Sequence, residues 1–163
     1  LDVIRQNPDI QFIWQTGRIY IDQVRDAITA ATGEAVHHPH INAIPNLYVT
    51  DFIKDMAKAY AAADLVISRA GSISEFCLLH KPVILVPSPN VAEDHQTKNA
   101  LALVDKDAAI YVKDAEAEEK LLPAALDTVK DSDKLKELSN NIARLALPDS
   151  ATVIAKEVLK LIK

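Results

Sequence analysis

The sequence predicts a Rossmann-like, doubly wound α/β domain built on a parallel sheet. Short apolar runs alternate along the chain with segments whose apolar residues recur at helical spacing. These runs are continuous rather than alternating in polarity, which is typical of strands buried on both faces of a sheet. Each expected strand is joined to the next through an expected helix, which is the connection that parallel strands use.

The elements are expected in a regular order, and loops with prolines or polar residues separate them. Strands are expected at residues 10–14, 47–50, 64–68, 83–87 and 108–112. Helices are expected at residues 19–31, 52–63, 72–80, 94–104, 116–129, 134–146 and 150–162. The apolar stripe of Phe52, Met56 and Tyr60 is expected to lie mainly in the core.

The composition is that of one soluble domain with a substantial core: 163 residues, 49% hydrophobic and 25% charged. The net charge of −5 argues against a general nucleic-acid-binding surface. No apolar run approaches the roughly 20 residues that a membrane span needs. The opening residues resemble the middle of a domain, so we expect residues 1–163 to be a single domain that lacks its first strand.

Polar turns follow four of the expected strands, at residues 15–18, 51–53, 69–72 and 88–96. In an open α/β sheet, ligands bind beyond the carboxyl ends of the strands. Polar residues from distant parts of the sequence are therefore expected to meet at this edge and to form the binding site.

The stretch from Arg69 to Glu75 offers the groups that a nucleotide needs. Gly71 would let the backbone turn sharply and approach a ligand, and the following helix start would favour a phosphate. The hydroxyl of Ser72 could add to this site, and the carboxylate of Glu75 could accept from a ribose diol. The same Ser72-x-x-Glu75 pattern is a capping box, which local sequence alone favours, and the two uses could coexist.

A second polar group lies at Asp94, His95, Gln96 and Asn99. Gln96 and Asn99 share one helix face, and their amides suit sugar hydroxyls. The alternative is an Asp94 N-cap followed by a solvated face. His95 is expected to be exposed or capping, since no partner for a catalytic base can be identified.

The remaining polar and reactive residues favour structural roles. His37, His38 and His40 are expected in a polar loop rather than a metal site, because their spacing is irregular and no acidic or cysteine cluster accompanies them. Cys77 is expected to pack within its helix, and residues 114–119 to form a solvated helix start. We expect no metal and no cofactor. The absence of G-x-G-x-x-G disfavours a dinucleotide oxidoreductase.

The segment from Asp51 to Ala100 resembles the C-terminal domain of the MurG family, and the likeness extends over nearly the whole chain. These enzymes transfer N-acetylglucosamine from UDP-N-acetylglucosamine to lipid I, forming lipid II for peptidoglycan. The resemblance implies the C-terminal half of a GT-B glycosyltransferase with inverting chemistry. It also implies a peripheral enzyme on the cytoplasmic face of the bacterial inner membrane, whose missing N-terminal domain binds lipid I, contacts the membrane and carries the general base.

The resemblance also implies roles for individual residues. Glu75 would hold the ribose hydroxyls, and the backbone of Phe52 and Ile53 would contact the uracil edge. Gln96 would contact the sugar hydroxyls, with Asn99 beside it. The turn and helix start facing the diphosphate would be formed by Arg69, Gly71, Ser72 and Ile73.

Two departures from the family pattern stand out. The stretch "GSISE" is about two residues shorter than usual between the glycine and the Ser-Glu pair, and the glycine-rich loop after the first strand is absent. Two alternatives also remain: another UDP-sugar enzyme such as an epimerase, or a non-catalytic α/β interaction module. The module predicts no uridine-selective binding, and the epimerase predicts a second domain with other catalytic residues.

Overall fold

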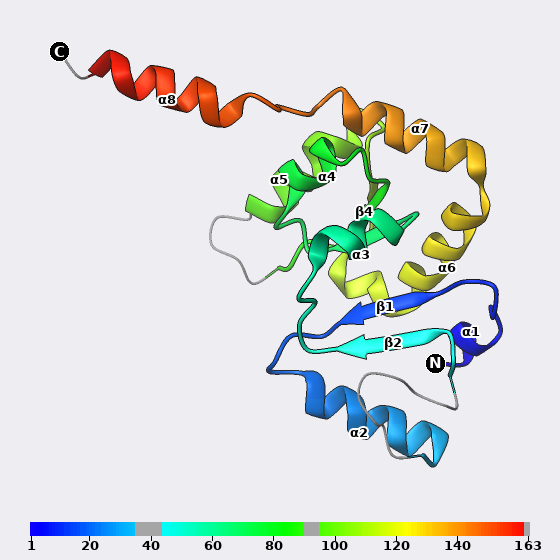
Figure 1. Cartoon of the computed structure of the whole chain (residues 1–163). Helices are drawn as coiled ribbons and strands as arrows, with labels where there is room; N and C mark the ends of the chain where they lie inside the picture. The colour runs from blue at the N-terminus through cyan, green and yellow to red at the C-terminus, as the bar shows by residue number, and fades with distance from the viewer. Residues whose placement is uncertain (35–43, 90–94, 162–163) are drawn as a thin grey trace. The chain divides into compact units, whose positions relative to one another are not determined.

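The computed structural model describes residues 1–34, 44–89 and 95–161 (Figure 1). The chain forms two compact units, residues 1–59 (unit 1) and residues 60–163 (unit 2), and each is described by itself. Strands and helices alternate as the sequence predicts, and every strand pairing is parallel.

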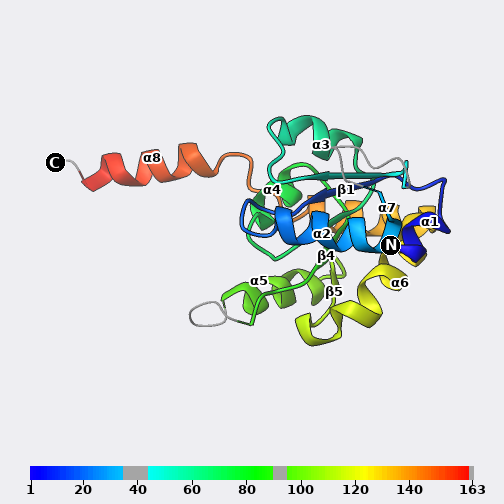
Figure 2. The same cartoon turned by 90° about the horizontal axis from the view of Figure 1, so that it is seen from below.

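Unit 1 contains a two-stranded parallel sheet with a helix packed on it. Its elements in chain order are α1 (Asp2–Arg5), β1 (Phe12–Gln15), α2 (Ile21–Thr32), β2 (Leu47–Thr50) and the first part of α3 (Met56–Ala62). The register pairs Phe12 with Leu47 and Gln15 with Thr50. Side chains of α1, α2 and β2 form one apolar cluster, and both views show α2 beside the strands (Figures 1 and 2).

A buried asparagine ties the start of unit 1 together. The Nδ2 atom of Asn46 donates to the backbone carbonyls of Ile4, Asn7 and Ile10 at 2.9–3.0 Å. Asn46 is only 6% exposed, so these contacts satisfy carbonyls that would otherwise lose water without replacement. Its three acceptors lie 36 to 42 positions earlier in the sequence, so no local pattern indicates these contacts.

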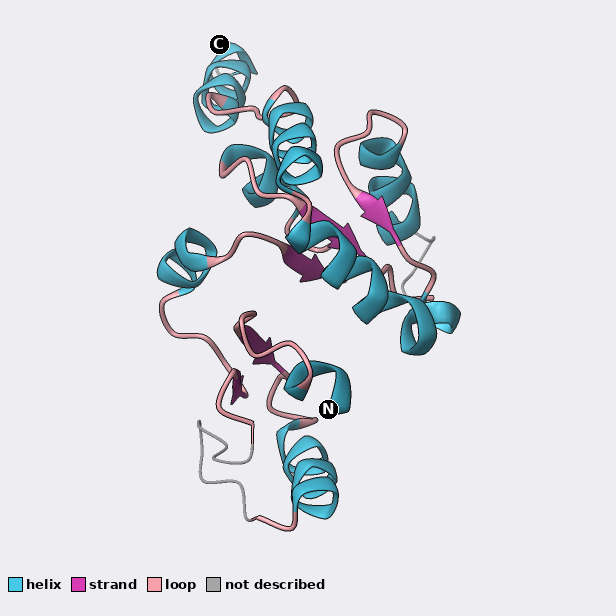
Figure 3. Ribbon diagram, turned by 90° about the vertical axis from the view of Figure 1, so that its right-hand side faces the viewer, coloured by secondary structure: helices cyan, strands magenta, loops and turns pink. Residues whose placement is uncertain are grey.

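Unit 2 is built on a three-stranded parallel sheet in the order β3-β4-β5 (Figure 3). Its elements after α3 are β3 (Val66–Ser68), α4 (Ile73–Leu78), β4 (Val83–Leu85), α5 (His95–Val104), β5 (Ile110–Tyr111), the 3₁₀ turn η2 (Asp114–Glu116), α6 (Ala117–Lys130), α7 (Ser132–Ala143) and α8 (Ser150–Leu161).

Helices cover both faces of this sheet. Val83 and Leu85 of β4 belong to a cluster with buried residues of α4, α5 and α7. Ile84, between them, belongs to a second cluster with residues of α6. All three side chains are fully buried, which explains why the central strand is continuously apolar in sequence.

The last helix has no such cover in this structure. Every described side chain of α8 is exposed, and Ile154 and Leu161 are among its large apolar residues. Across residues 1–34, 44–89 and 95–161, no helix is long and apolar enough to cross a membrane.

One expectation about the fold is wrong. The helix expected from residue 52 begins at Met56, and none of its residues is buried. Phe52 is 57% exposed and lies in the preceding turn. Hydrogen bonds with the side chains of Thr50 and Gln15 close that turn. The helix therefore starts only after Asp55, whose Oδ1 accepts from the backbone N–H of Lys58 at 3.2 Å.

Candidate functional site

The carboxyl edge of the sheet in unit 2 gathers most of the predicted site residues. Val86 N–H donates to Ser68 C=O at 2.8 Å, and Val112 N–H donates to Leu85 C=O at 3.0 Å. These bonds bring the ends of the three strands level with one another. The turns that follow therefore leave the sheet at one edge, which is where ligands bind in open parallel sheets.

The turn after β3 is sharp because of Ala70, which corrects the role expected of Gly71. Ala70 has a left-handed φ of 63° and is 3% exposed, whereas the φ of Gly71 is not positive. A Cβ built on Gly71 would meet no atom within 4 Å. The fold itself therefore does not require a glycine at position 71, and the space beside it is open to a ligand.

The N-terminus of α4 is not closed by its own side chains. Ser72 occupies the N-cap position, but its side chain makes no capping hydrogen bond. Among the described residues, the backbone N–H groups of Ile73 and Ser74 have no acceptor. The capping box expected of Ser72 and Glu75 is therefore not formed, because the carboxylate turns to another partner.

That partner is a tyrosine from the preceding helix. The hydroxyl of Tyr60 donates to Oε2 of Glu75 at 3.5 Å, and both side chains reach the surface. Burial raises the pKa of Tyr60, and the nearby charge of Glu75 raises this pKa further. Glu75 thus presents a carboxylate at the surface, one turn inside α4.

Arg69 is held by an acidic residue that follows β5. Its Nη1 atom forms a charged hydrogen bond with Oδ1 of Asp114, with 61% of the arginine side chain and 34% of the aspartate side chain exposed. Asp114 was expected only as part of a solvated helix start. Because β3 and β5 both pair with β4 in parallel, their carboxyl ends lie at one edge, which brings this carboxylate near Arg69. No local sequence signal indicates this contact.

Gln96 is fixed at the same edge by the loop that follows β4. Its Oε1 atom accepts from the backbone N–H of Ser88 at 2.9 Å, which leaves the Nε2 donors to face other groups. Asn99 lies one turn further along α5 and is exposed. His95, also exposed, is the first residue of α5, and the N-cap expected at Asp94 lies outside the described residues.

Phe52 and Ile53 lie in unit 1, in a turn that is closed by side chains. Ile53 N–H donates to Oε1 of Gln15 at 2.9 Å, and Oγ1 of Thr50 donates to Phe52 C=O at 3.1 Å. The neighbouring turn is joined to it, since Thr16 N–H donates to Thr50 C=O at 2.9 Å. The structure thus groups these two residues with each other, and groups the remaining predicted site residues in unit 2.

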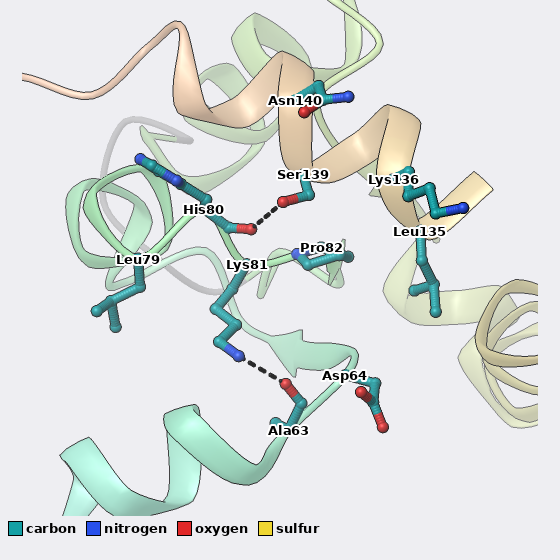
Figure 4. A pocket seen from close by; sticks show the side chains of 10 residues that line it. All are labelled: Ala63, Asp64, Leu79, His80, Lys81, Pro82, Leu135, Lys136, Ser139 and Asn140. Atoms are coloured by element: carbon teal, nitrogen blue, oxygen red, sulfur yellow. Dashed lines mark hydrogen bonds between the residues drawn. The ribbon is translucent and has the colours of Figure 1, made fainter. Parts of the chain in front are cut away.

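A pocket in unit 2 lies at the opposite, amino edge of the sheet (Figure 4). Its volume is about 380 Å³. Two of its polar side chains are committed to the backbone: Lys81 Nζ donates to Ala63 C=O and Ser139 Oγ donates to His80 C=O, each at 2.8 Å. The side-chain ends of His80 and Lys136 point away from each other in Figure 4, and the pocket lies between α7 and the segments that precede β3 and β4.

The other residues considered for chemistry lie where the sequence expected them or outside the description. Cys77 is buried in α4, and burial raises the pKa of its thiol, which disfavours the reactive thiolate. His37, His38 and His40 fall outside the described residues. Within those residues, no group of three or more His, Cys, Asp or Glu side chains could hold a metal ion.

Comparisons with known proteins show the family to which this chain belongs. The model of the glycosyltransferase family 28 C-terminal domain matches residues 2–154. A UDP-N-acetylglucosamine--N-acetylmuramyl-(pentapeptide) pyrophosphoryl-undecaprenol N-acetylglucosamine transferase from Bacteroides fragilis is 74% identical over 99% of this chain, and the protein of the same name from Bacteroides thetaiotaomicron is 72% identical over 99%. The chain spans 40% and 41% of the length of these two relatives.

Solved structures match the same region. A crystal structure of MurG from Acinetobacter baumannii has a TM-score of 0.76 at 28% identity, and the match covers 97% of this chain and 44% of that one. The glycotransferase of kitacinnamycin has a TM-score of 0.61 at 21% identity, covering 88% of this chain and 32% of that one, and shows the fold alone. These matches confirm the fold class predicted from the sequence.

Proposed function

The chain belongs to the family of glycosyltransferase family 28 C-terminal domains, and we propose that it is the donor-binding part of an N-acetylglucosaminyltransferase. The resemblance to the MurG family that was based on residues 51–100 is confirmed by the family model and by the relatives' names. The proposed donor is UDP-N-acetylglucosamine, and the proposed acceptor is lipid I, which becomes lipid II in peptidoglycan synthesis.

The observation that carries this proposal is the open carboxyl edge of the sheet in unit 2. It presents on one edge the carboxylate of Glu75, the amide of Gln96 and N–H groups of α4 that have no acceptor among the described residues. These groups suit a diphosphate, a ribose diol and sugar hydroxyls, respectively. α4 has only six residues, so the assignment of the diphosphate to its N-terminus depends on the family as well as on the geometry.

The base would be bound by the turn of unit 1. The N3–H and O4 groups of uracil complement a backbone carbonyl and a backbone N–H, respectively. Because the N–H of Ile53 already donates to Gln15, the carbonyl of Ile53 is the better candidate for a direct contact. Contact with the N–H would require the Gln15 side chain to move away.

In the proposed reaction, the acceptor's 4-hydroxyl oxygen attacks the anomeric carbon while the bond from that carbon to the diphosphate oxygen breaks. The configuration inverts, the hydroxyl proton passes to a general base, and UDP leaves. Donors already directed at the diphosphate would stabilise the charge that develops on it. We expect the base, the lipid I site and the membrane contact in the N-terminal domain, with the enzyme peripheral to the cytoplasmic face of the inner membrane.

The test is a calorimetric titration of the full-length enzyme with UDP-N-acetylglucosamine, UDP and ADP. We expect uridine nucleotides to bind more tightly than ADP. In Glu75→Gln, neutral hydrogen bonds replace charge-assisted ones, so UDP should bind about tenfold more weakly, a change of roughly 1.4 kcal/mol. Equal binding of UDP and ADP to the parent enzyme would contradict the proposed function, whereas UDP binding unchanged in Glu75→Gln would contradict the ribose role.

A further inference from the structure

Among the described residues, the Tyr60 side chain is the group that holds the Glu75 carboxylate. Tyr60 lies in α3 and Glu75 in α4, and the hydroxyl reaches Oε2 at 3.5 Å. No local pattern relates these two residues, which are 15 positions apart in the sequence. The contact exists because α3 and α4 are the helices on either side of β3.

The aromatic ring of Tyr60 is fixed independently of Glu75. It meets the ring of Phe76 edge to face, with the centroids 5.7 Å apart and the planes at 89°. Phe76 is 1% exposed and belongs to the main core of unit 2, against which Tyr60 also packs. The hydroxyl is therefore held at a defined place beside α4, whereas the long, exposed Glu75 side chain has several rotamers available.

The capping box that Ser72 and Glu75 would otherwise form is absent, as described above, so the tyrosine hydroxyl takes the place of the helix end as the partner of the carboxylate. A carboxylate has two oxygens, each able to accept more than one hydrogen bond. With Oε2 held by Tyr60, Oε1 and the remaining lone pair of Oε2 are left for a diol. The charge of Glu75 also raises the pKa of Tyr60, which keeps the hydroxyl protonated and able to donate.

We propose that Tyr60 is a positioning residue for nucleotide binding: its hydroxyl fixes the Glu75 carboxylate in the orientation that accepts the ribose hydroxyls. This inference rests on the proposed function, since it requires Glu75 to hold a ribose. The Tyr60 hydroxyl also has a hydrogen bond with the side chain of Ser72, so the part of the affinity that comes from the ribose diol has to be measured separately from the rest.

The test compares UDP with 2′,3′-dideoxy-UDP, which lacks both ribose hydroxyls, by calorimetry on the full-length enzyme. Tyr60→Phe keeps the ring and its packing on Phe76 but removes the hydroxyl. We expect UDP to bind about threefold more weakly, because one long hydrogen bond to a charged group is lost. The affinity for dideoxy-UDP should be unchanged. Tyr48→Phe is the matched control, because it removes a tyrosine hydroxyl from within β2, before the turn that follows this strand, and should change neither affinity.

A second comparison shows whether Tyr60 acts through Glu75. Glu75→Ala should abolish the preference for UDP over dideoxy-UDP, and adding Tyr60→Phe to it should cause no further loss. If Tyr60→Phe weakens both nucleotides equally, or lowers only the melting temperature, the residue has a structural role and the inference is overturned. If Glu75→Ala keeps the preference for UDP, the ribose assignment itself is overturned, and with it the positioning role.

Discussion

The turn after β2 in unit 1 and the turn after β3 in unit 2 occupy the same place in a strand–turn–helix unit, yet they are built in opposite ways. In unit 1, Thr50 and Gln15 satisfy the backbone of Phe52 and Ile53, and Asp55 caps the following helix. In unit 2, Ala70 is in a left-handed conformation and α4 has no side-chain cap.

The two turns differ in whether their backbone groups already have hydrogen-bond partners within the chain. Buried or turning backbone is normally paired with a side chain, backbone or water, and an unpaired helix start costs stability. Unit 1 avoids this cost at the expense of one N–H that could bind a base. In unit 2 the start of α4 is accessible to solvent, so water can satisfy the N–H groups that have no acceptor among the described residues. The proposed diphosphate would take the place of this water. Five substitutions, each described below with its expected effect, test this difference.

The largest effect is expected at Ala70. This residue combines a left-handed φ of 63° with 3% exposure, and a β-branched side chain suits neither condition. Ala70→Val should lower the free energy of unfolding by about 2–4 kcal/mol in denaturant titrations of the full-length protein. Ala70→Gly is the control. Glycine relieves the backbone strain, and this gain offsets the loss of a buried methyl group and the higher entropy of the unfolded chain. The free energy of unfolding should therefore stay within about 1 kcal/mol of the parent.

Gly17, in the turn after β1, and Gly71, in the turn after β3, should respond differently to alanine. Gly17 in unit 1 has a φ of 79°, so Gly17→Ala should lower the free energy of unfolding by about 1–2 kcal/mol. Gly71 has no such constraint and faces open space. Gly71→Ala should therefore leave stability unchanged but weaken UDP binding about tenfold, because the new methyl group enters the space of the ligand.

Unchanged UDP affinity in Gly71→Ala would show that no ligand approaches this position. The open turn would then be a property of the unbound fold alone.

A smaller effect is expected from the closed turn of unit 1. Thr50 is 3% exposed, and Thr50→Val preserves its shape while removing the hydroxyl that contacts Phe52. The free energy of unfolding should fall by about 1 kcal/mol, and amide exchange at Phe52 and Ile53 should become faster. The control Thr152→Val, on the exposed α8, should change neither quantity. Slow exchange retained in Thr50→Val would mean that Gln15 alone closes the turn.

The smallest effect is a pH dependence at the start of α3. The pKa of Asp55 is lowered, first by its side-chain hydrogen bond with Lys58 and then by the backbone N–H of Lys58. Because this pKa is lower in the folded state, ionised Asp55 adds to the free energy of unfolding. This contribution is complete above the ordinary pKa of 3.8 and is lost as the pH falls through the pKa of the folded state. Asp55→Asn should flatten this acid limb of the stability curve. An acid limb identical to that of the parent would show that the cap contributes nothing.

The sequence is sufficient to predict that strands and helices alternate and that the strands form a parallel sheet. Val83, Ile84 and Leu85 form a continuous apolar run because both faces of β4 are covered, and burial on both faces leaves no position for a polar residue. It also placed Arg69, Gly71, Glu75 and Gln96 after strands, and such residues meet at one edge whenever the strands are parallel. The family roles of these residues, including those of Phe52, Ile53, Ser72, Ile73 and Asn99, remain proposals.

The hydrogen-bond partner of each of these groups depends on the tertiary packing. The patterns that predicted a capping box and a buried Phe52 stripe are local, and both lost to contacts from distant residues, namely Tyr60 with Glu75 and Gln15 with Ile53. The pairing of Arg69 with Asp114 spans 45 residues and requires the ends of β3 and β5 to lie at one edge. Several possible partners offer hydrogen bonds of similar strength, so the one that forms is the one that the packed backbone places within reach. The distance between residues that are far apart in sequence is not given by local sequence.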